Sequence, residues 1–289
     1  MKDSLILTFD LEEWFHLCLP DDDISLWPYR EKRFKANVED LLEILAARNI
    51  KATFLVLGWI AEEYPETISD IFKMGHDIGT HSYAHELIYK QSYDEFTEDL
   101  LKSKNILEEI IGNEVNIYRA PAFSINNQTI WAFEILAENG IKYDLSLFQG
   151  RHSLGGIAGI KIEEPFVIRT NSGDLIEYPI SVSNLFNLSF ATCGGGYFRL
   201  IPYTFIKRLL KDRDYKMTYF HPRDFDYDQP RISMPIIKYF KTYVGLKNAR
   251  KKFITLLDNH NMIALSTCVK TRPKRDMRTI NIDELSKNL

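Results

Sequence analysis

Two histidines four residues apart are the first feature of this sequence that could do chemistry. His81 and His85 follow Asp77 to Thr80, a short run that predicts a β-strand. Four residues make about one helical turn, so both imidazoles can face one point and ligate one ion, as histidine pairs at this spacing do in zinc sites. Such pairs also occur by chance in solvated or core positions. A metal site needs a third ligand from elsewhere, for which a carboxylate is suitable.

Three acidic residues near the N-terminus supply candidate carboxylates. Asp10, Glu12 and Glu13 follow the apolar run Leu5 to Phe9, which predicts a buried strand. If the extended conformation persists, Asp10 and Glu12 point to one side while Leu11 and Glu13 point to the other. We therefore interpret Asp10 and Glu12 as the functional pair and Glu13 as a solvated residue.

Short β-rich runs alternate with helical patterns along the chain, which predicts βα units around a parallel sheet or barrel. Active sites of such barrels lie at the carboxyl ends of the strands, where these acids and histidines fall. Residues 150–196 are rich in glycine and predict loops and a hairpin inserted between barrel units. The predicted strands are 5–9, 52–57, 77–80, 115–118, 142–147, 217–220 and 262–266, and the predicted helices are 37–48, 65–74, 92–112, 129–139, 202–211 and 247–259.

Four motifs occur in a recognisable order: Thr8-Phe9-Asp10, His81-Ser82-Tyr83-Ala84-His85, Arg119-Ala120-Pro121 and Phe220-His221-Pro222. With them, residues 5–262 resemble the polysaccharide deacetylases of the NodB-homology type, carbohydrate esterase family 4. The resemblance is closest to the exopolysaccharide-associated branch, with its Asp-x-Glu-Glu-Trp opening and a Gly-Gly-Gly-Tyr-Phe-Arg segment at residues 194–199. It implies an α/β fold, a distorted (β/α) barrel of about seven strands, and metal-assisted hydrolysis of an N-acetyl group on an amino sugar.

The resemblance also implies a role for each catalytic residue. Asp10 is the expected general base, which Arg119 orients through a charge-assisted contact. His221 is the expected general acid, because an ordinary imidazole pKa of about 6.5 lets it change charge near neutral pH. Asp144 matches an acid that contacts the catalytic residues without touching the substrate.

The expected metal ligands are His81, His85 and Glu12. Most family members have a second aspartate, a metal ligand, at the position of Leu11, which cannot coordinate an ion. Glu12 is the nearest substitute, in agreement with the alternation argument above. The expected cofactor is a divalent metal, first of all Zn²⁺, with Co²⁺ or Ni²⁺ as alternatives, which would polarise the acetyl carbonyl and acidify a bound water.

Composition narrows the function classes. The 289 residues have a formal charge of -4, so no basic field favours nucleic acid, and no apolar run reaches the roughly 20 residues of a membrane-spanning helix. Three cysteines without a CxxC pair fit reduced, inert thiols, and no export signal is visible. We expect a cytoplasmic enzyme, located at the membrane face, whose partner is an amino-sugar glycan or lipid-linked sugar. The oligomeric state stays open.

Residues 1–270 are expected to form the NodB-like domain, and 271–289 a charged, solvated tail. Trp14, Phe15 and Trp59 could stack on a sugar or belong to the core, and the three glycines at 194–196 fit either a turn or close approach of a glycan. Two functional alternatives remain: an amidohydrolase for formamide or ureide small molecules, and a catalytically silent glycan-binding protein.

Overall fold

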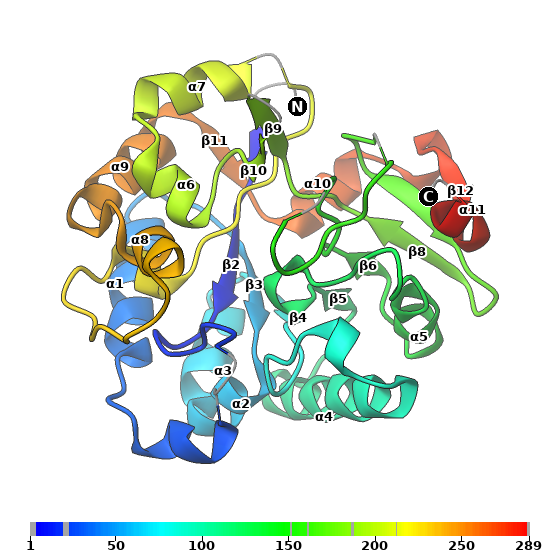
Figure 1. Cartoon of the computed structure of the whole chain (residues 1–289), viewed down its shortest axis with the longest axis horizontal. Helices are drawn as coiled ribbons and strands as arrows, with labels where there is room; N and C mark the ends of the chain where they lie inside the picture. Colours follow the sequence, from blue (N-terminus) through cyan, green and yellow to red (C-terminus); the bar gives the residue numbers. More distant parts are fainter. Residues whose placement is uncertain are drawn as a thin grey trace.

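A mostly parallel sheet forms the centre of the protein, with helices around it (Figure 1). The structure is a computed structural model and describes residues 4–19, 23–150, 152–160, 162–185, 188–211 and 213–287. Its strands are β1 (Ser4–Ile6), β2 (Thr8–Leu11), β3 (Thr53–Val56), β4 (Asp77–Thr80), β5 (Ile117–Tyr118), β6 (Tyr143–Asp144), β7 (Phe166–Arg169), β8 (Asp174–Glu177), β9 (Val182–Leu185), β10 (Leu188–Ala191), β11 (Asn261–Ile263) and β12 (Thr279–Asn281).

The α-helices alternate with these strands, as the sequence pattern predicts. They are α1 (Phe34–Ala46), α2 (Gly58–Glu63), α3 (Pro65–Lys73), α4 (Tyr93–Ile111), α5 (Ala132–Glu138), α6 (Gly195–Leu200), α7 (Tyr203–Lys211), α8 (Ile236–Tyr243), α9 (Leu246–Asn259), α10 (Leu265–Thr271) and α11 (Ile282–Lys287). Ser92 caps α4 with the expected capping box to Glu95, and Gly112 ends that helix in the left-handed conformation.

The central sheet has the strand order β12-β7-β8-β6-β5-β4-β3-β2, and only β7 and β8 pair antiparallel. Beyond β2 the sheet continues as parallel bridges from Ile6 to Met217 and from Phe9 to Phe220, while β1 pairs with β11. The predicted α/β barrel architecture is confirmed. These pairings place the end of β2 directly beside His221.

Aromatic packing fixes this junction. Phe9 of β2 stacks on Phe54 of β3 with ring centroids 5.2 Å apart, and Phe253 of α9 lies 5.9 Å from Phe9 and 5.2 Å from Phe220. All four rings are fully buried. The carboxyl ends of β2 and of the 217–220 segment therefore share one rigid support.

Two expectations about the rest of the chain are wrong. The hairpin of β7 and β8 is not an insertion between barrel units, because β8 pairs in parallel with β6 inside the central sheet. The C-terminal tail is not solvated throughout: β12 covers the edge of β7, and Ile280 and Leu285 are buried. These two apolar side chains favour packing over hydration despite the charged residues around them.

Within the described ranges, no helix is both long and apolar enough to cross a membrane.

Candidate active site

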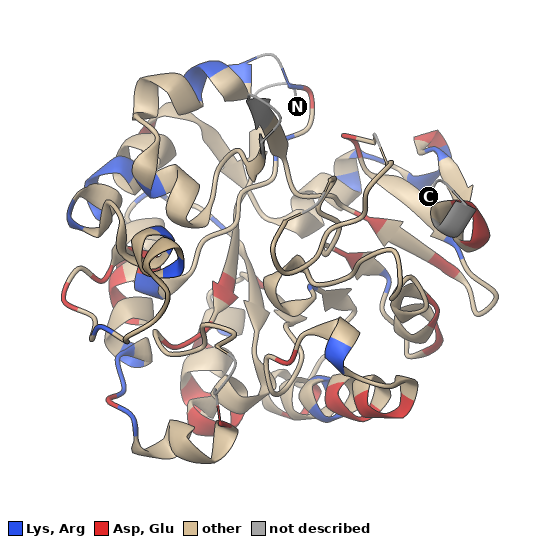
Figure 2. Cartoon of the chain, viewed as in Figure 1, with Lys and Arg blue, Asp and Glu red and all other residues tan. Residues whose placement is uncertain are grey.

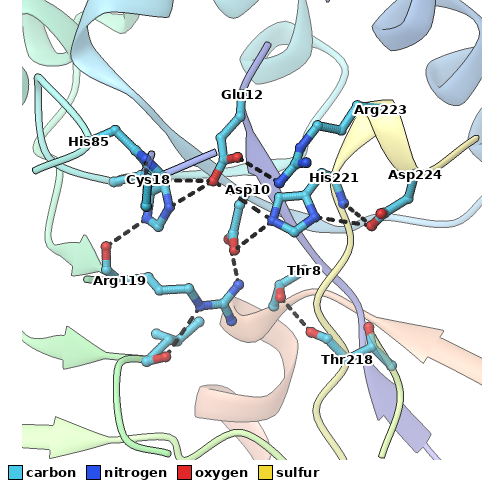
Figure 3. A network of polar contacts seen from close by, with 12 residues as sticks. Thr8, Asp10, Glu12, Cys18, His85, Arg119, Thr218, His221, Arg223 and Asp224 are labelled. Atoms are coloured by element: carbon cyan, nitrogen blue, oxygen red, sulfur yellow. Dashed lines mark hydrogen bonds and ion pairs between the residues drawn. The ribbon is translucent and has the colours of Figure 1, made fainter. Parts of the chain in front are cut away.

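The candidate site lies at the carboxyl ends of β2 and β4, beside the turn that follows Phe220 (Figure 3). Asp10 is in β2, and Glu12 follows the last residue of that strand. The structure brings both together with His221: one ligand atom from each lies within 4.8 Å of the others. Leu11 is fully buried in the hydrophobic core, on the opposite side of the strand.

Glu13 is not the solvated residue that the sequence pattern suggests. Only 1% of its surface is exposed. Its carboxylate accepts the backbone N–H groups of Arg33 at 2.9 Å and Phe34 at 3.0 Å, at the beginning of α1. Burial raises the pKa of Glu13, and these hydrogen bonds oppose that rise. Glu13 therefore satisfies free N–H groups at a helix N-terminus, which favours an acidic side chain.

His81 and His85 converge on Glu12. Oε1 of Glu12 lies 2.9 Å from Nε2 of His85 and 3.3 Å from Nε2 of His81. All three side chains are buried, and one donor atom of each lies within 4.8 Å of the others. The structure thus assembles the three residues that the sequence nominates as metal ligands.

The four-residue spacing of His81 and His85 suggests a helical turn. In the structure, a loop brings the two side chains together. Residues 81–87, which follow β4, form no helix, and Ser82 and His85 adopt left-handed φ values of 67° and 54°. Asp99 of α4 holds this loop by accepting the N–H groups of Tyr83 and Ala84, each at 2.9 Å. A contact distant in sequence therefore imposes the backbone conformation that aims His85.

The chemistry of these three donors fits a divalent metal ion. Nδ1 of His81 lies 2.7 Å from the carbonyl oxygen of Arg119, which fixes the tautomer with hydrogen on Nδ1. The lone pair of Nε2 then faces Glu12, and this buried atom has no hydrogen-bond partner in the described part of the chain. Two imidazoles and a carboxylate are a donor set that zinc takes, and a carbonyl behind the ring is typical of ligating histidines.

Electrostatics keep Glu12 ionised. Burial alone would raise the pKa of its carboxyl group, but the surrounding imidazoles, above all that of His85, lower that pKa well below its ordinary value. Nη2 of Arg223 also lies 3.4 Å from Oε2 of Glu12. An ionised carboxylate is the form that binds a cation.

Cys18 is not simply an inert small residue, because its Sγ lies 3.5 Å from Nδ1 of His85. Burial alone would lower the pKa of His85, but interactions with Cys18 and Glu12 raise it well above its ordinary value. Cys18 therefore contacts Nδ1 of His85 and Glu12 contacts Nε2, and together they orient the ring.

Asp10 forms a buried ion pair with Arg119, as expected. Nη1 of the arginine donates to Oδ1 of Asp10 at 2.6 Å, and its Nε donates to the carbonyl oxygen of Leu145 at 3.2 Å. Arg119 is fully buried, so its guanidinium is fixed in one orientation. The second oxygen of Asp10 faces His221.

His221 lies across the site from the histidine pair. Its Nε2 is 3.7 Å from Oε1 of Glu12 and 4.0 Å from Oδ2 of Asp10. Its Nδ1 is 3.0 Å from Oδ2 of Asp224, which also accepts the backbone N–H of His221 at 2.9 Å. Burial lowers the pKa of His221 to about 4, although the carboxylates of Glu12 and Asp10 act in the opposite direction.

Arg199 holds Asp224 from behind. The guanidinium pairs with Oδ1 of Asp224 and donates to the carbonyl oxygens of Lys241, Thr242 and Val244 at 2.7 to 3.0 Å. It belongs to the Gly-Gly-Gly-Tyr-Phe-Arg segment. This segment therefore acts through Arg199, as part of the support of His221.

The three glycines of that segment pack closely against other parts of the protein. A Cβ on Gly194 would overlap the ring of Tyr219, and one on Gly196 would press on the carbonyl oxygen of Lys241. The absence of side chains thus lets α6 approach its neighbours closely.

Of the two alternatives for the aromatic residues near the strand ends, the core position is confirmed. Trp14, Phe15 and Trp59 are buried and pack together in the core. Their rings offer little surface to a ligand.

Asp144 supports the segment of Arg119. The hydroxyl of Ser146 donates to Oδ1 of Asp144 at 2.6 Å and accepts the N–H of Ala120 at 2.8 Å. Glu177 is the register partner of Asp144 on β8 and is equally buried. Burial raises the pKa of Asp144, while burial and the charge of Asp144 raise the pKa of Glu177 well above its ordinary value. Glu177 is thus the protonated member of the pair.

Sequence reasoning missed several of these groups. Asp224 carried a signal, because it stands three residues after His221 in a His-Pro-Arg-Asp run. The others are recruited by tertiary packing and carry no local pattern: Cys18, Asp99, Glu177, Arg199 and Arg223.

Comparisons with known proteins match both halves of the chain. Residues 2–143 match the family model described as polysaccharide deacetylase, and residues 145–270 match one described as a domain of unknown function (DUF3473). Asp10, Glu12, His81, His85 and Arg119 lie in the first segment, and His221 with its supporting residues lies in the second.

Three curated relatives share parts of this sequence. The peptidoglycan-N-acetylglucosamine deacetylase of Bacillus cereus is 37% identical over 95 residues, 32% of this chain and 34% of that protein. The peptidoglycan-N-acetylmuramic acid deacetylase PdaC of Bacillus subtilis is 32% identical, over 32% of this chain and 20% of the relative. The peptidoglycan deacetylase of Helicobacter pylori is 29% identical, over 44% of this chain and 41% of the relative. The matches thus span less than half of each relative.

Solved structures share the fold over nearly the whole chain. A Mycobacterium smegmatis protein assigned as a polysaccharide deacetylase superposes with a TM-score of 0.64 at 21% identity, covering 96% of this chain and 93% of the other. The catalytic domain of a peptidoglycan N-acetylglucosamine deacetylase from Eubacterium rectale gives a TM-score of 0.52 at 16% identity, covering 97% and 93%.

Proposed function

Because this chain belongs to the polysaccharide deacetylase family through residues 2–143, we propose that it is a metal-dependent hydrolase that removes N-acetyl groups from an amino sugar. The observation that carries the proposal is the convergence of three potential ligands, Glu12, His81 and His85, beside the Asp10–Arg119 ion pair and His221. The substrate that we propose is a polysaccharide or a lipid-linked glycan precursor.

We further propose that Glu12, His81 and His85 hold one divalent ion, with Zn²⁺ as the first candidate and Co²⁺ or Ni²⁺ as substitutes. When bound, such an ion supplies Lewis acidity for an acyl carbonyl and for water.

The chain's own residues account for the movement of protons. Asp10, held by Arg119, accepts a proton from the attacking water at the oxygen that faces His221. His221 is neutral in the free protein because burial lowers its pKa to about 4, so its Nε2 can take up that proton. Asp224 then stabilises the imidazolium, which delivers the proton to the departing amine.

We propose that residues 1–270 act as one catalytic unit. The base, its arginine and the candidate ligands come from the first matched segment, and His221, Asp224 and Arg199 come from the second. The N–H of Asp10 donates to the carbonyl oxygen of Phe220 at 2.8 Å, so the two segments meet at the site itself.

Acetate release from N-acetylglucosamine oligosaccharides tests this proposal. The metal-stripped protein is expected to be inactive and to regain activity with Zn²⁺, Co²⁺ or Ni²⁺, while Asp10→Asn stays inactive with every ion. A panel of formamide and ureide compounds, scored for formate and ammonia, tests the small-molecule amidohydrolase. Oligosaccharide binding without turnover in any metal would instead establish a silent glycan-binding protein.

A further inference from the structure

Helix α8 exposes an apolar face. Ile236, Ile237 and Phe240 are 84%, 70% and 51% exposed. Ile236 and Phe240 are four residues apart and so lie on one side of the helix, with Ile237 next to them. Apolar side chains gathered in this way mark a surface that binds something apolar.

The same part of the chain is strongly basic. Residues 229–257 contain seven lysines and arginines and no aspartate or glutamate, although the whole chain has a charge of -4. Figure 2 shows basic residues on α8 and on the neighbouring α9. Lys241 stands four residues after Ile237, and Lys247 is at the beginning of α9, and both are exposed. Positive charge therefore borders the apolar face.

We propose that α8 docks on an anionic lipid bilayer. Ile236, Ile237 and Phe240 enter the boundary between headgroups and acyl chains, and Lys241 and Lys247 meet lipid phosphates, the arrangement of an interfacial helix. A second copy of this chain is a poorer occupant, because it would bring the basic residues of two copies together. A polyanion without an apolar part would leave the apolar face uncovered.

The docking face is connected to the candidate active site at two points. The Nζ of Lys238 donates to the carbonyl oxygen of Cys18 at 2.8 Å, and Cys18 contacts His85. The last turn of α8 accepts hydrogen bonds from Arg199, which pairs with Asp224. A bilayer against α8 would thus lie close to the catalytic groups. This docking goes beyond the proposed hydrolysis and does not depend on it.

Vesicle co-sedimentation tests the proposal with the full chain. We expect binding to vesicles of equal parts phosphatidylcholine and phosphatidylglycerol, and little binding to pure phosphatidylcholine. The triple variant Ile236→Ser, Ile237→Ser, Phe240→Ser should bind at least about tenfold more weakly, since three side chains no longer enter the lipid. Lys241→Gln and Lys247→Gln should each weaken binding by about fivefold. The matched control Leu26→Ser with Tyr29→Ser changes side chains that are 49% and 87% exposed elsewhere, and should bind normally.

Three results would overturn the proposal. They are failure of the wild type to bind anionic vesicles, unchanged binding by the triple variant, and a concentration-dependent dimer in light scattering that the triple variant abolishes. All variants should keep wild-type circular dichroism and the wild-type rate on soluble oligosaccharides. That rate separates this proposal from the proposed function, because a protein without hydrolytic activity could still bind vesicles.

Discussion

At the scale of single residues, the main departure from the family pattern concerns the acidic metal ligand. The expected acid at position 11 is a leucine, and we propose that Glu12 takes its place. Leu11 points into the core, and the proposed ligand Glu12 reaches the two histidines from the next position. Glu12 follows the last residue of β2, and its side chain is longer than that of aspartate. It can therefore reach His81 and His85. In the metal site that we propose, the strand geometry, and not only the identity of the acid, decides which residue can bind the ion.

The first prediction concerns substitutions at positions 11 and 12. Glu12→Gln should weaken zinc binding by more than about a hundredfold, the upper end of what loss of a supporting contact costs. Adding Leu11→Asp should not restore it, and should destabilise the fold by about 3 kcal/mol or more, because position 11 would bury an unpaired charge. Zinc titration against a competing chelator and urea unfolding measure both effects. Recovered affinity in the double variant would show that position 11 can face the ion.

The second prediction concerns Asp224, which we propose positions His221. Asp224→Asn should lower kcat by about a hundredfold or more, with little change in KM or metal content, because the imidazolium loses its partner. Asp224→Glu should recover part of the rate. The control Asp226→Asn removes the charge from a partly buried ion pair, with Arg33, outside the site. If Asp224→Asn and Asp226→Asn lose the same amount of rate, Asp224 has only a structural role.

At the scale of elements, the sequence predicts regular structure well and irregular structure poorly. The bounds of β4 and the capping box of α4 follow from local pattern, as does the beginning of α3 at Pro65. Local pattern did not predict the loop that carries His85, because its left-handed residues depend on hydrogen bonds to Asp99 of the following helix, α4. Helix α8 was missed because its exposed apolar face has no core-facing periodicity.

The candidate site shows the same division. Motif order predicts Asp10, Arg119 and His221, and these groups do meet. Arg199 could not be predicted, because its role depends on packing between α6 and α8 and not on its neighbours in sequence. Sequence motifs thus predict the proposed catalytic residues. They do not predict the residues that position these groups through tertiary contacts.

Acid stability provides a prediction at this scale. His76 joins the beginnings of β3 and β4 by accepting the N–H of Ala52 at 3.1 Å, and burial lowers its pKa to about 4. The unfolded chain has a histidine pKa near 6.5 and binds the proton more tightly. His76 therefore leaves stability unchanged above about pH 6.5 and lowers the free energy of unfolding by up to about 3 kcal/mol as the pH falls to about 4.

His76→Asn keeps an acceptor for Ala52 and removes the titrating ring, so this part of the pH dependence should disappear from urea unfolding curves. His260→Asn, at a half-exposed histidine, is the control. A wild-type pH dependence in His76→Asn would place the acid-sensitive group elsewhere.

At the scale of the whole molecule, the site exists because segments from both ends of the chain meet. β1 pairs with β11, and Phe9 and Phe220 are bridged beside the catalytic groups. The rigid aromatic junction beneath them holds Asp10 and His221 beside each other, with Oδ2 of Asp10 4.0 Å from Nε2 of His221. Helix α8, which we propose docks on a bilayer, contacts both Arg199 and Cys18 of this assembly.

Diffraction data collected at the zinc absorption edge from crystals of the zinc-soaked protein test the central claim most directly. We predict one strong anomalous peak per chain, bonded to Glu12, His81 and His85 at about 2.0 to 2.2 Å and adjacent to Asp10. The peak should vanish in His81→Ala and persist in Asp10→Asn. A peak elsewhere, or none among these three side chains in a protein that releases acetate, would contradict the account.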